Sequence, residues 1–337
     1  MRGGSRRATQ WDIAREAGVS QATVSLVLRG VDSLGIAAAT SARVRETAQA
    51  LGYAPNRSAR TLRTHQAEVI AVVVPDIGNP FYSSLLRGVQ SVSDRAGYDV
   101  MTINTDGRAE RERRVLTWGL EGRVDGVTGV FFTLRATDFR PLADAGVAVV
   151  RIESVAKRDG QLPIDNLYVD NRAAAAAATR YLLERGRRQI AMIAGQGGPQ
   201  DERSSGYAQA LSACGLAPRL LIDAEFTETG GYRATLRMLD EDGRPDAIFA
   251  ANDLMAIGAM AALRERGLSI PRDVAVIGFD DILVARLVTP ALTTVSQFQQ
   301  DLGAVAAETL LARLHHWAPA HGTSREMPYQ LIERAST

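Results

Sequence analysis

The side chains with the clearest chemical role lie near the N-terminus, in the segment TQWDIAREAGVSQATVSLVLRG (residues 9–30). The spacing of its apolar residues predicts two short helices joined by a tight turn. The second helix is expected to turn four side chains outward, those of Gln21, Ala22, Ser25 and Leu26. A helix of this kind is suited to the major groove of DNA, so the segment predicts a helix-turn-helix.

Small residues and a cap would position that second helix. Ala14 supplies the small side chain that two steeply crossing helices need at their contact. Gly18 suits the turn, because a left-handed backbone costs glycine almost nothing. Ser20 is expected to cap the second helix by accepting a backbone N–H near Thr23. One small core is then expected from Ile13, Val24, Val27 and Leu28.

Charge is distributed unevenly along the 337 residues. Residues 1–65 carry ten arginines and four acidic residues, hence +6, whereas the whole chain carries +1, so the remainder carries −5. A basic head suits a nucleic-acid reader, because phosphate neutralisation supplies most non-specific affinity for DNA. The composition, with 46% hydrophobic and 23% charged residues, is that of an ordinary globular protein, and the length suits two or three domains.

Cysteine content and apolar runs bear on location. Cys214 is the only cysteine, so no intrachain disulfide can form and a cytoplasmic setting is expected. Its place on the predicted helix AQALSACGL favours a small buried side chain. The start MRGGSRRATQ lacks the apolar stretch of a secretory signal, and no apolar run reaches the roughly 18 residues of a membrane span.

The pattern divides the chain into a helical head and an α/β body. Helices are expected at about 10–17, 20–29 and 40–51, followed by a polar linker at 55–66. Strands are expected at 69–75, 98–105, 125–132, 147–153, 189–195, 220–226, 247–251 and 274–280. Helices between them are expected at 81–96, 171–185, 203–214, 230–240 and 253–266. This alternation indicates two doubly wound lobes with parallel sheets, and a ligand cleft beyond the carboxyl ends of the strands.

Four segments together resemble the LacI/GalR family of bacterial transcriptional regulators. They are DIAREAGVSQATVSLVL in the head, LGYAPNRSARTLRT (51–64), VVVPDIGNPFYSSLLRGV (72–89), and PDAIFAANDLMAIGAMAALRERGLSIPRDVAVIGFDD (245–281) with TPALTTV (289–295). The likeness runs from Thr9 to about Leu311, and four motifs in the family's order are highly specific.

The resemblance implies an all-α head and a two-lobed body of the type I periplasmic-binding-protein kind. It implies a DNA-binding domain at 1–54, a hinge at 55–66, and an effector-binding and dimerisation domain at 67–337. Lobe one would span about 67–168 and 296–325, and lobe two about 169–295. The expected protein is a dimeric repressor of a palindromic operator, without catalytic activity or cofactor. A small molecule in the cleft would control it, a carbohydrate being favoured and a nucleobase the alternative.

The resemblance also implies which side chains of the head touch DNA. Base edges would be read by Gln21, Ala22 and Leu26, since glutamine can pair with adenine and alanine can contact a thymine methyl. Leu26 departs from the arginine that many members carry, so a different base preference is expected there. The alternative for Gln21 and Leu26 is that they are merely exposed. Further contacts, mostly with phosphates, are expected from Thr9, Ser20, Thr23, Ser25 and Arg29.

Residues 56–63, NRSARTLR, form the second expected DNA site. A helix this short is not stable alone. The resemblance implies that it folds on DNA, pairs with its dimer mate and wedges Leu62 into the minor groove. Arg57, Arg60 and Arg63 would flank that wedge on the DNA backbone, and Asn56 is also expected to bind DNA. The alternative for Leu62 is an ordinary packed leucine of a linker.

Seven residues just after body strands map onto effector positions of the family: Phe81, Tyr82, Glu153, Arg203, Phe226, Asn252 and Asp280. Aromatic rings can stack on a sugar or base, and the polar groups can pair its hydroxyls. Phe81 and Phe226 could instead be core residues, and Arg203 with Asp280 a structural ion pair. Asn252 could be only a helix cap, as could Asp253; capping is favoured for Asp170 and Asn171. Glu153 departs from the aspartate more usual at its position.

Two other kinds of protein share parts of this pattern. GQGGPQ (195–200) follows a strand as in a dinucleotide-binding enzyme, but a third glycine and a clear acidic partner are missing. No histidine has metal-ligand spacing, so no metal site is expected. An exported sugar-binding protein would share the body but would need a signal peptide in place of residues 1–65. No leucine heptad follows residues 328–334, which favours a dimer over a tetramer.

Overall fold

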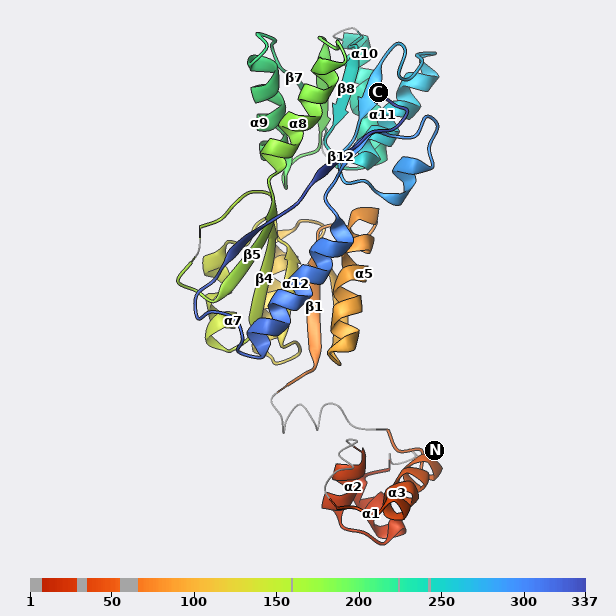
Figure 1. Ribbon diagram of the computed structural model, residues 1–337, viewed down its shortest axis with the longest axis vertical. Helices are drawn as coiled ribbons and strands as arrows, with labels where there is room; N and C mark the ends of the chain where they lie inside the picture. Colours follow the sequence, from red (N-terminus) through yellow and green to blue (C-terminus); the bar gives the residue numbers. More distant parts are fainter. Residues whose placement is uncertain (1–7, 29–34, 55–65, 159, 224, 242–243) are drawn as a thin grey trace. The chain divides into compact units, whose positions relative to one another are not determined.

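The computed structural model describes residues 8–28, 35–54, 66–158, 160–223, 225–241 and 244–337 (Figure 1). The chain divides into two units, Met1–His65 and Gln66–Thr337, here called the head and the body. Six positions expected to contact DNA lie outside the described residues: Arg29, Asn56, Arg57, Arg60, Leu62 and Arg63.

Three helices form the described part of the head: α1 (Gln10–Ala17), α2 (Gln21–Leu28) and α3 (Ala38–Ala50). A capping box begins α1, where the Asp12 backbone N–H donates to the Thr9 hydroxyl at 3.3 Å and the Thr9 N–H donates to the Asp12 carboxylate at 2.9 Å. The helix ends at Gly18, whose φ of 62° is left-handed. The turn between α1 and α2 therefore has the geometry that its glycine predicted.

The core of the head draws on all three helices. Its buried apolar residues are Ile13, Ala14, Ala17, Val24, Val27, Val44 and Ala48. Leu28 packs against them and is partly buried. The expectation that Ser25 faces outward is wrong, since Ser25 is only 6% exposed. Because α2 packs against both α1 and α3, its buried face is wider than that of a helix with one neighbour.

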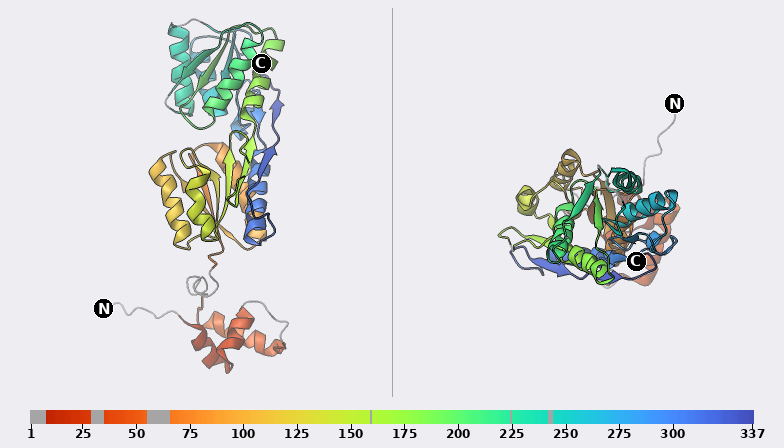
Figure 2. Two further views of the ribbon diagram at one scale, coloured as in Figure 1. Left: turned by 90° about the vertical axis from the view of Figure 1, so that its left-hand side faces the viewer. Right: turned by 90° about the horizontal axis from the view of Figure 1, so that it is seen from above.

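A six-stranded parallel sheet forms lobe one of the body, in the order β11-β5-β4-β3-β1-β2. Its strands are β1 (Val69–Val74), β2 (Asp99–Asn104), β3 (Gly126–Val130), β4 (Ala148–Glu153), β5 (Ile164–Val169) and β11 (Ser324–Met327). Two layers of helices cover it (Figure 2): α5 (Pro80–Arg95) with α12 (Gln299–Leu314), and α6 (Ala109–Leu120) with α7 (Arg140–Asp144). Alternate residues of β1 are buried under the two layers, which explains its unbroken apolar sequence.

A four-stranded parallel sheet forms lobe two, in the order β7-β6-β8-β9. Its strands are β6 (Ile190–Ala194), β7 (Arg219–Ile222), β8 (Ala247–Ala250) and β9 (Ala275–Ile277). Its helices are α8 (Asn171–Glu184), α9 (Gln200–Ser212), α10 (Glu228–Glu241) and α11 (Asp253–Glu265). The body is thus two α/β lobes with parallel sheets, as the alternating pattern predicted.

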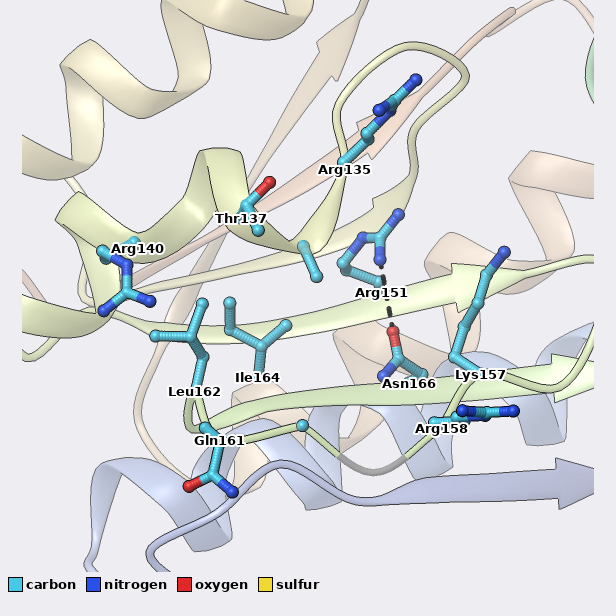
Figure 3. A pocket seen from close by; sticks show the side chains of 12 residues that line it. Arg135, Thr137, Arg140, Arg151, Lys157, Arg158, Gln161, Leu162, Ile164 and Asn166 are labelled. Carbon is cyan, nitrogen blue, oxygen red and sulfur yellow. Dashed lines mark hydrogen bonds between the residues drawn. The ribbon is translucent and has the colours of Figure 1, made fainter.

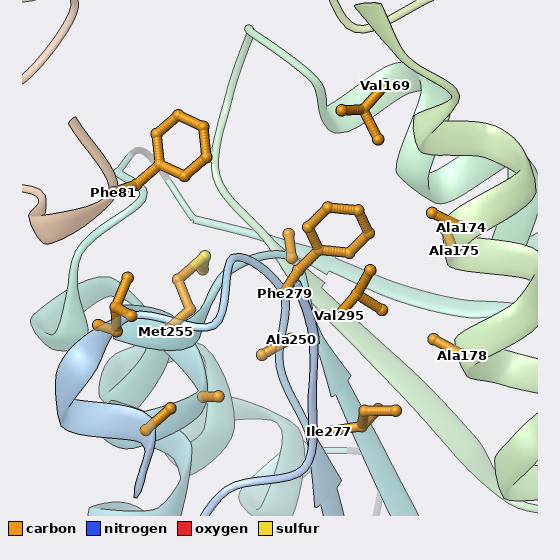
Figure 4. Close-up of a cluster of buried hydrophobic side chains, with 14 of the residues drawn as sticks. Phe81, Val169, Ala174, Ala175, Ala178, Ala250, Met255, Ile277, Phe279 and Val295 are labelled. Atoms are coloured by element: carbon orange, nitrogen blue, oxygen red, sulfur yellow. The ribbon is translucent and has the colours of Figure 1, made fainter. Parts of the chain in front are cut away.

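The chain crosses between the lobes after β5, before α12 and after β11 (Figure 1). At the last two crossings, β10 (Thr294–Ser296) pairs antiparallel with β12 (Gln330–Ile332). Ser336 then donates a hydrogen bond from Oγ to the Val276 carbonyl at 2.6 Å, so the last residues pack on lobe two. A buried cluster around Phe81, Phe279 and Val295 spans both lobes at this level (Figure 4).

Several local expectations differ from the structure. The sequence pattern did not predict strands β5, β10 and β11. Two 3-10 helices also occur, at Ala136–Phe139 and Leu283–Arg286. Cys214 is exposed, contrary to expectation, because α9 ends at Ser212 and leaves Cys214 in the following turn. Within the described ranges, no helix has the length and apolar character to cross a membrane.

Candidate functional site

The N-terminus of α2 presents the side chains expected to read bases. Ala22 is exposed, and Gln21 and Leu26 are half-buried. Ser20 is the expected cap, because its Oγ accepts the Thr23 backbone N–H at 3.1 Å. The hydroxyls of Ser20 and Thr23 lie 2.8 Å apart at an exposed helix N-terminus, the kind of place that suits a phosphate.

Gln10 is a positioning residue that the sequence argument missed. Its Oε1 accepts a hydrogen bond from Gln21 Nε2 at 2.9 Å, which fixes the direction of the Gln21 amide. Gln10 is the first residue of α1 and Gln21 the first of α2, so the motif brings two helix starts together. Thr9 is also more constrained than expected, because its hydroxyl belongs to the capping box of α1.

A cavity of about 810 Å³, here called the interlobe cleft, is lined by residues of both lobes. All seven expected effector residues line it: Phe81, Tyr82, Glu153, Arg203, Phe226, Asn252 and Asp280. They come together because each lies at or beyond the carboxyl end of a strand, and the carboxyl ends of parallel strands meet at one edge of a sheet.

Arg203 and Asp280 form a buried pair in the cleft. Arg203 Nη2 lies 3.5 Å from Asp280 Oδ1, and Gln297 Nε2 donates to the same oxygen at 2.7 Å. Burial raises the pKa of Asp280 to about 6, although Arg203 and Gln297 oppose the shift. The guanidinium of Arg203 also lies 3.8 Å from the centre of the Phe279 ring. The ion-pair alternative is therefore realised, and the pair still borders the cavity.

Two aromatic residues at the start of α5 wall the cleft from lobe one. Phe81 and Tyr82 meet edge to face, with ring centres 5.1 Å apart. Phe81 is 7% exposed and belongs to the buried cluster of Figure 4, so it serves both as core and as cleft wall. Burial, together with the negative charge of Asp280, raises the pKa of Tyr82 above its ordinary value. Its hydroxyl is therefore a neutral hydrogen-bond donor at physiological pH.

Helix caps account for two of the polar residues at the cleft. Asn252 accepts the Met255 N–H at 2.8 Å and donates to the Phe226 carbonyl at 3.0 Å, so the capping alternative is realised. Asp170 caps α8 by accepting the Ala173 N–H at 2.9 Å. The capping expectation for Asn171 is wrong, because Asp170 is the N-cap and the Asn171 side chain bonds to Arg203.

Asn171 orients the key arginine of the cleft. Its Oδ1 accepts from Arg203 Nε at 2.7 Å, while its Nδ2 donates to the carbonyls of Val169 at 2.9 Å and Ser154 at 3.2 Å. Asn171 is buried and lines the cleft. A residue at the first turn of a helix gives no sequence signal for such a role, because its partner Arg203 is far along the chain.

Glu153 ends β4 inside a small cluster of charges. Arg151 forms an ion pair with it, and Lys157 Nζ lies 3.4 Å from Glu153 Oε2. The Arg151 and Glu153 side chains are only 8% and 11% exposed. The Glu153 carboxylate is therefore held between two cations at the cleft wall, and neither cation was singled out from the sequence.

Glu112 holds a loop at the mouth of the cleft. Its carboxylate is fully buried and accepts the N–H groups of Phe132, Thr133 and Leu134 at 2.8 to 3.0 Å. Phe132 lines the cleft and meets the glycine loop of lobe two, since a Cβ built on Gly198 would lie 2.8 Å from its ring. The GQGGPQ segment therefore forms part of the cleft wall.

Two family models match the chain. Residues 9–56 match "Bacterial regulatory proteins, lacI family", and residues 179–337 match "Periplasmic binding protein-like domain". Full-length relatives agree: catabolite control protein A of Priestia megaterium is 32% identical over 98% of this chain and 99% of its own length. The chain belongs to the lacI family of bacterial regulatory proteins.

Other lacI-family relatives are named as repressors. The ribose operon repressor of Halalkalibacterium halodurans is 32% identical, with 97% of this chain and 96% of that protein covered. The transcriptional repressor CytR of Escherichia coli K12 is 32% identical, with coverage of 98% and 96%. The protein is therefore a DNA-binding regulator of transcription and not an enzyme.

Solved structures of lacI-family proteins share the fold. The lac repressor dimer bound to operator and the anti-inducer ONPF superposes with a TM-score of 0.85 at 27% identity, covering 98% of this chain and 99% of that one. A LacI-family regulator from Enterococcus faecium with bound ribose gives a TM-score of 0.72 at 28% identity, covering 80% and 98%. The match confirms the expected helix-turn-helix head and two-lobed body.

Proposed function

We propose that this protein is a homodimeric repressor that binds a palindromic operator and responds to a sugar in the interlobe cleft. It would act in the cytoplasm, on the bacterial nucleoid. Its parts would be a DNA-binding domain (1–54), a hinge (55–66), and an effector-binding and dimerisation domain (67–337). The observation that carries the proposal is the convergence of seven side chains from both lobes on one cavity, in a chain whose head is a helix-turn-helix.

The lining of the cleft favours a carbohydrate. Its volume of about 810 Å³ is typical of small-molecule sites, and aromatic rings from both lobes, such as Tyr82 and Phe226, can stack on a sugar ring. Arg203 and Asp280 supply a donor and an acceptor for hydroxyls. Relatives with solved structures are described with bound ribose and cellobiose. A nucleobase is the second candidate, because the same rings can stack on it.

A ligand that touches both lobes can act only by favouring one lobe arrangement over another. The lobe next to the hinge would then move its dimer contacts and spread or join the two hinge helices. Such a ligand-dependent change of lobe arrangement is compatible both with induction and with co-repression.

Exposed apolar side chains support a dimer. Leu283, Val284 and Leu287 lie within one turn of chain in lobe two and are 56%, 36% and 68% exposed. Burial of such side chains against a second copy would stabilise it by about 2 kcal/mol each. A two-fold dimer also matches the symmetry of palindromic half-sites.

Ligand binding is tested by calorimetric titration of the full chain with sugars and nucleosides. A bound sugar should lose at least about tenfold in affinity in Asp280→Asn, because an NH₂ donor replaces one carboxylate acceptor and the negative charge is lost. Asp240→Asn is the matched control, since Asp240 is exposed on α10 and pairs with Arg266 outside the cleft. Failure of every sugar to bind would contradict the carbohydrate assignment.

Base reading is tested with an operator obtained by in vitro selection. Gln21→Ala should weaken operator binding by about 1–3 kcal/mol and leave non-specific binding unchanged, as expected for a lost base contact. Gln10→Ala should have a smaller effect of the same kind, because it frees the Gln21 amide. Gln49→Ala, exposed on α3, is the control. Equal effects on all DNA sequences would contradict the role.

The hinge assignment rests on Leu62. Leu62→Gly should spare folding but reduce operator affinity by about tenfold or more, since the apolar wedge is lost. Leu62→Met keeps an apolar wedge and should retain most of the affinity. Unchanged binding of the glycine variant at constant salt would argue for an ordinary linker leucine.

A further inference from the structure

A second cavity, here called the basic pocket, lies in lobe one beside α7, strand β4, the start of β5 and the segment that joins these two strands (Figure 3). Its volume is about 430 Å³. Among the described residues that line it, five of twelve are cationic and none is acidic; the cations are Arg135, Arg140, Arg151, Lys157 and Arg158.

Arg151 forms the buried wall of the basic pocket. It donates to Asn166 Oδ1 at 3.4 Å and to the Leu134 carbonyl at 3.1 Å, and pairs with Glu153. Its Nε has no hydrogen-bond partner among the described residues. A guanidinium stays charged in proteins, so an unused donor on a side chain that is 8% exposed favours an anion nearby.

Four further cations surround the opening and are exposed: Arg135, Arg140, Lys157 and Arg158. Lys157 pairs with Glu153, which also faces Arg151, and Asp138 and Glu112 are the other acids close to Arg151. The side chains of Arg135 and Arg140 form no ion pair with an acid in the parts of the chain that the structure covers. Among the described residues, positive charge therefore exceeds negative charge around this cavity.

We propose that the basic pocket binds a small phosphorylated molecule. Guanidinium groups bind phosphate oxygens through two parallel hydrogen bonds, and five cations suit a multiply charged anion. The volume exceeds that of a lone phosphate and falls in the range of small-molecule sites. Leu162 and Ile164 add an apolar side, which suits the carbon skeleton of a phosphate ester. The site is separate from the interlobe cleft and does not depend on the sugar proposed there.

Calorimetric titration of the full chain tests the site, with ribose 5-phosphate, inorganic pyrophosphate, sulfate and ribose as probes. Arg135→Gln with Arg140→Gln should weaken binding of the phosphorylated probe by about tenfold or more. Arg95→Gln with Arg113→Gln is the matched control, because both are exposed arginines of lobe one outside the pocket. The control should change affinity less than twofold.

The same titration distinguishes a phosphate ester from a free inorganic polyanion as the ligand. Binding of ribose 5-phosphate, but not of pyrophosphate, supports an ester ligand, and the reverse pattern overturns it in favour of a free polyanion. Binding that sulfate matches, or that both double variants weaken equally, shows only general charge attraction and overturns the site. Asp280→Asn, which alters the cleft, should leave binding of the phosphorylated probe unchanged; its loss would assign the probe to the cleft instead.

Lys157 offers an independent readout, because it is the only lysine of the chain. Acylation by an N-hydroxysuccinimide ester, followed by peptide mass spectrometry, measures its accessibility. Saturating ribose 5-phosphate should slow acylation of Lys157 by at least about fivefold, whereas ribose should not. Equal rates with and without the phosphorylated probe would contradict a ligand seated against this side chain.

Discussion

Arg151 and Glu153 lie two residues apart on β4, and their ion pair joins the two cavities of lobe one. Arg151 lines the basic pocket and Glu153 lines the interlobe cleft. Both side chains are about nine-tenths buried, so the pair is shielded from water. Burial lowers the pKa of Arg151 and Glu153 opposes that shift, which indicates that the carboxylate compensates the buried charge.

Glu153→Gln should therefore destabilise the body. The variant leaves the Arg151 guanidinium buried without its main counter-charge, so the free energy of unfolding should fall by about 3 kcal/mol. Urea denaturation at neutral pH measures the change. Glu121→Gln is the control, because Glu121 pairs with Arg123 at 2.6 Å between side chains that are roughly half exposed. That control should cost less than about 1 kcal/mol, and similar losses in both variants would contradict the role of Glu153.

Asp280 gives the stability of the body a dependence on pH. Its pKa is raised from 3.8 to about 6, so the folded protein holds the Asp280 proton more tightly than the unfolded chain does. The contribution of the protonated Asp280 to the stability of the folded body is therefore fully present below about pH 4 and is lost as the pH rises through about 6. Asp280→Asn cannot titrate, so its free energy of unfolding should rise relative to wild type between pH 4 and pH 7, by about 3 kcal/mol at most.

Denaturation at several pH values checks this sign. Asp240→Asn is the control, because its pKa is lowered by Arg266 and its contribution therefore runs in the opposite direction. A constant difference between wild type and Asp280→Asn from pH 4 to pH 7 would contradict the raised pKa.

The sequence predicted the cleft residues better than the elements that support them. All seven lie at or beyond the carboxyl ends of strands, and the convergence of parallel strand ends is a rule that needs no knowledge of side-chain contacts. Strand β5 escaped notice because Asp165 and Asn166 interrupt its apolar run. Both are buried in pairs made far along the chain: Asp165 with Arg313 at 2.7 Å and Asn166 with Arg151. Buried polar pairs of this kind can be recognised only once the fold is known.

Ser25 and Asn171 illustrate the same limit for single residues. Helical periodicity placed Ser25 outward, but Ser25 is buried in a head where α2 packs against both α1 and α3. Asn171 has the residue type of a cap, yet its amide is directed at Arg203 by the packing of α8 against α9. In both cases a tertiary neighbour, which has no local signature, decides the role of the side chain.

Leu287→Arg should convert the proposed dimer into a monomer. Leu287 is 68% exposed beside Leu283, and an arginine in a buried interface would carry an unpaired charge. Sedimentation velocity should show the dimer dissociation constant rise at least tenfold, which corresponds to about 1.4 kcal/mol. Leu120→Arg is the control, because Leu120 is 53% exposed at the end of α6 in lobe one. A variant that remains as dimeric as the control would place the interface elsewhere.

Glu112→Gln should loosen the loop that bears Phe132. The carboxylate accepts three backbone N–H groups and the Thr133 hydroxyl, whereas an amide would turn an NH₂ group toward some of these donors. Because Glu112 is fully buried, the lost bonds should lower the free energy of unfolding by about 2–3 kcal/mol. Glu110→Gln, exposed on the same helix, should change it by less than about 0.5 kcal/mol.

A ligand of the cleft should also dissociate faster from Glu112→Gln, since Phe132 lines that cavity and loses its anchor. Stopped-flow release of the bound sugar measures this rate, and a rate equal to that of Glu110→Gln would mean that the loop is held by other contacts.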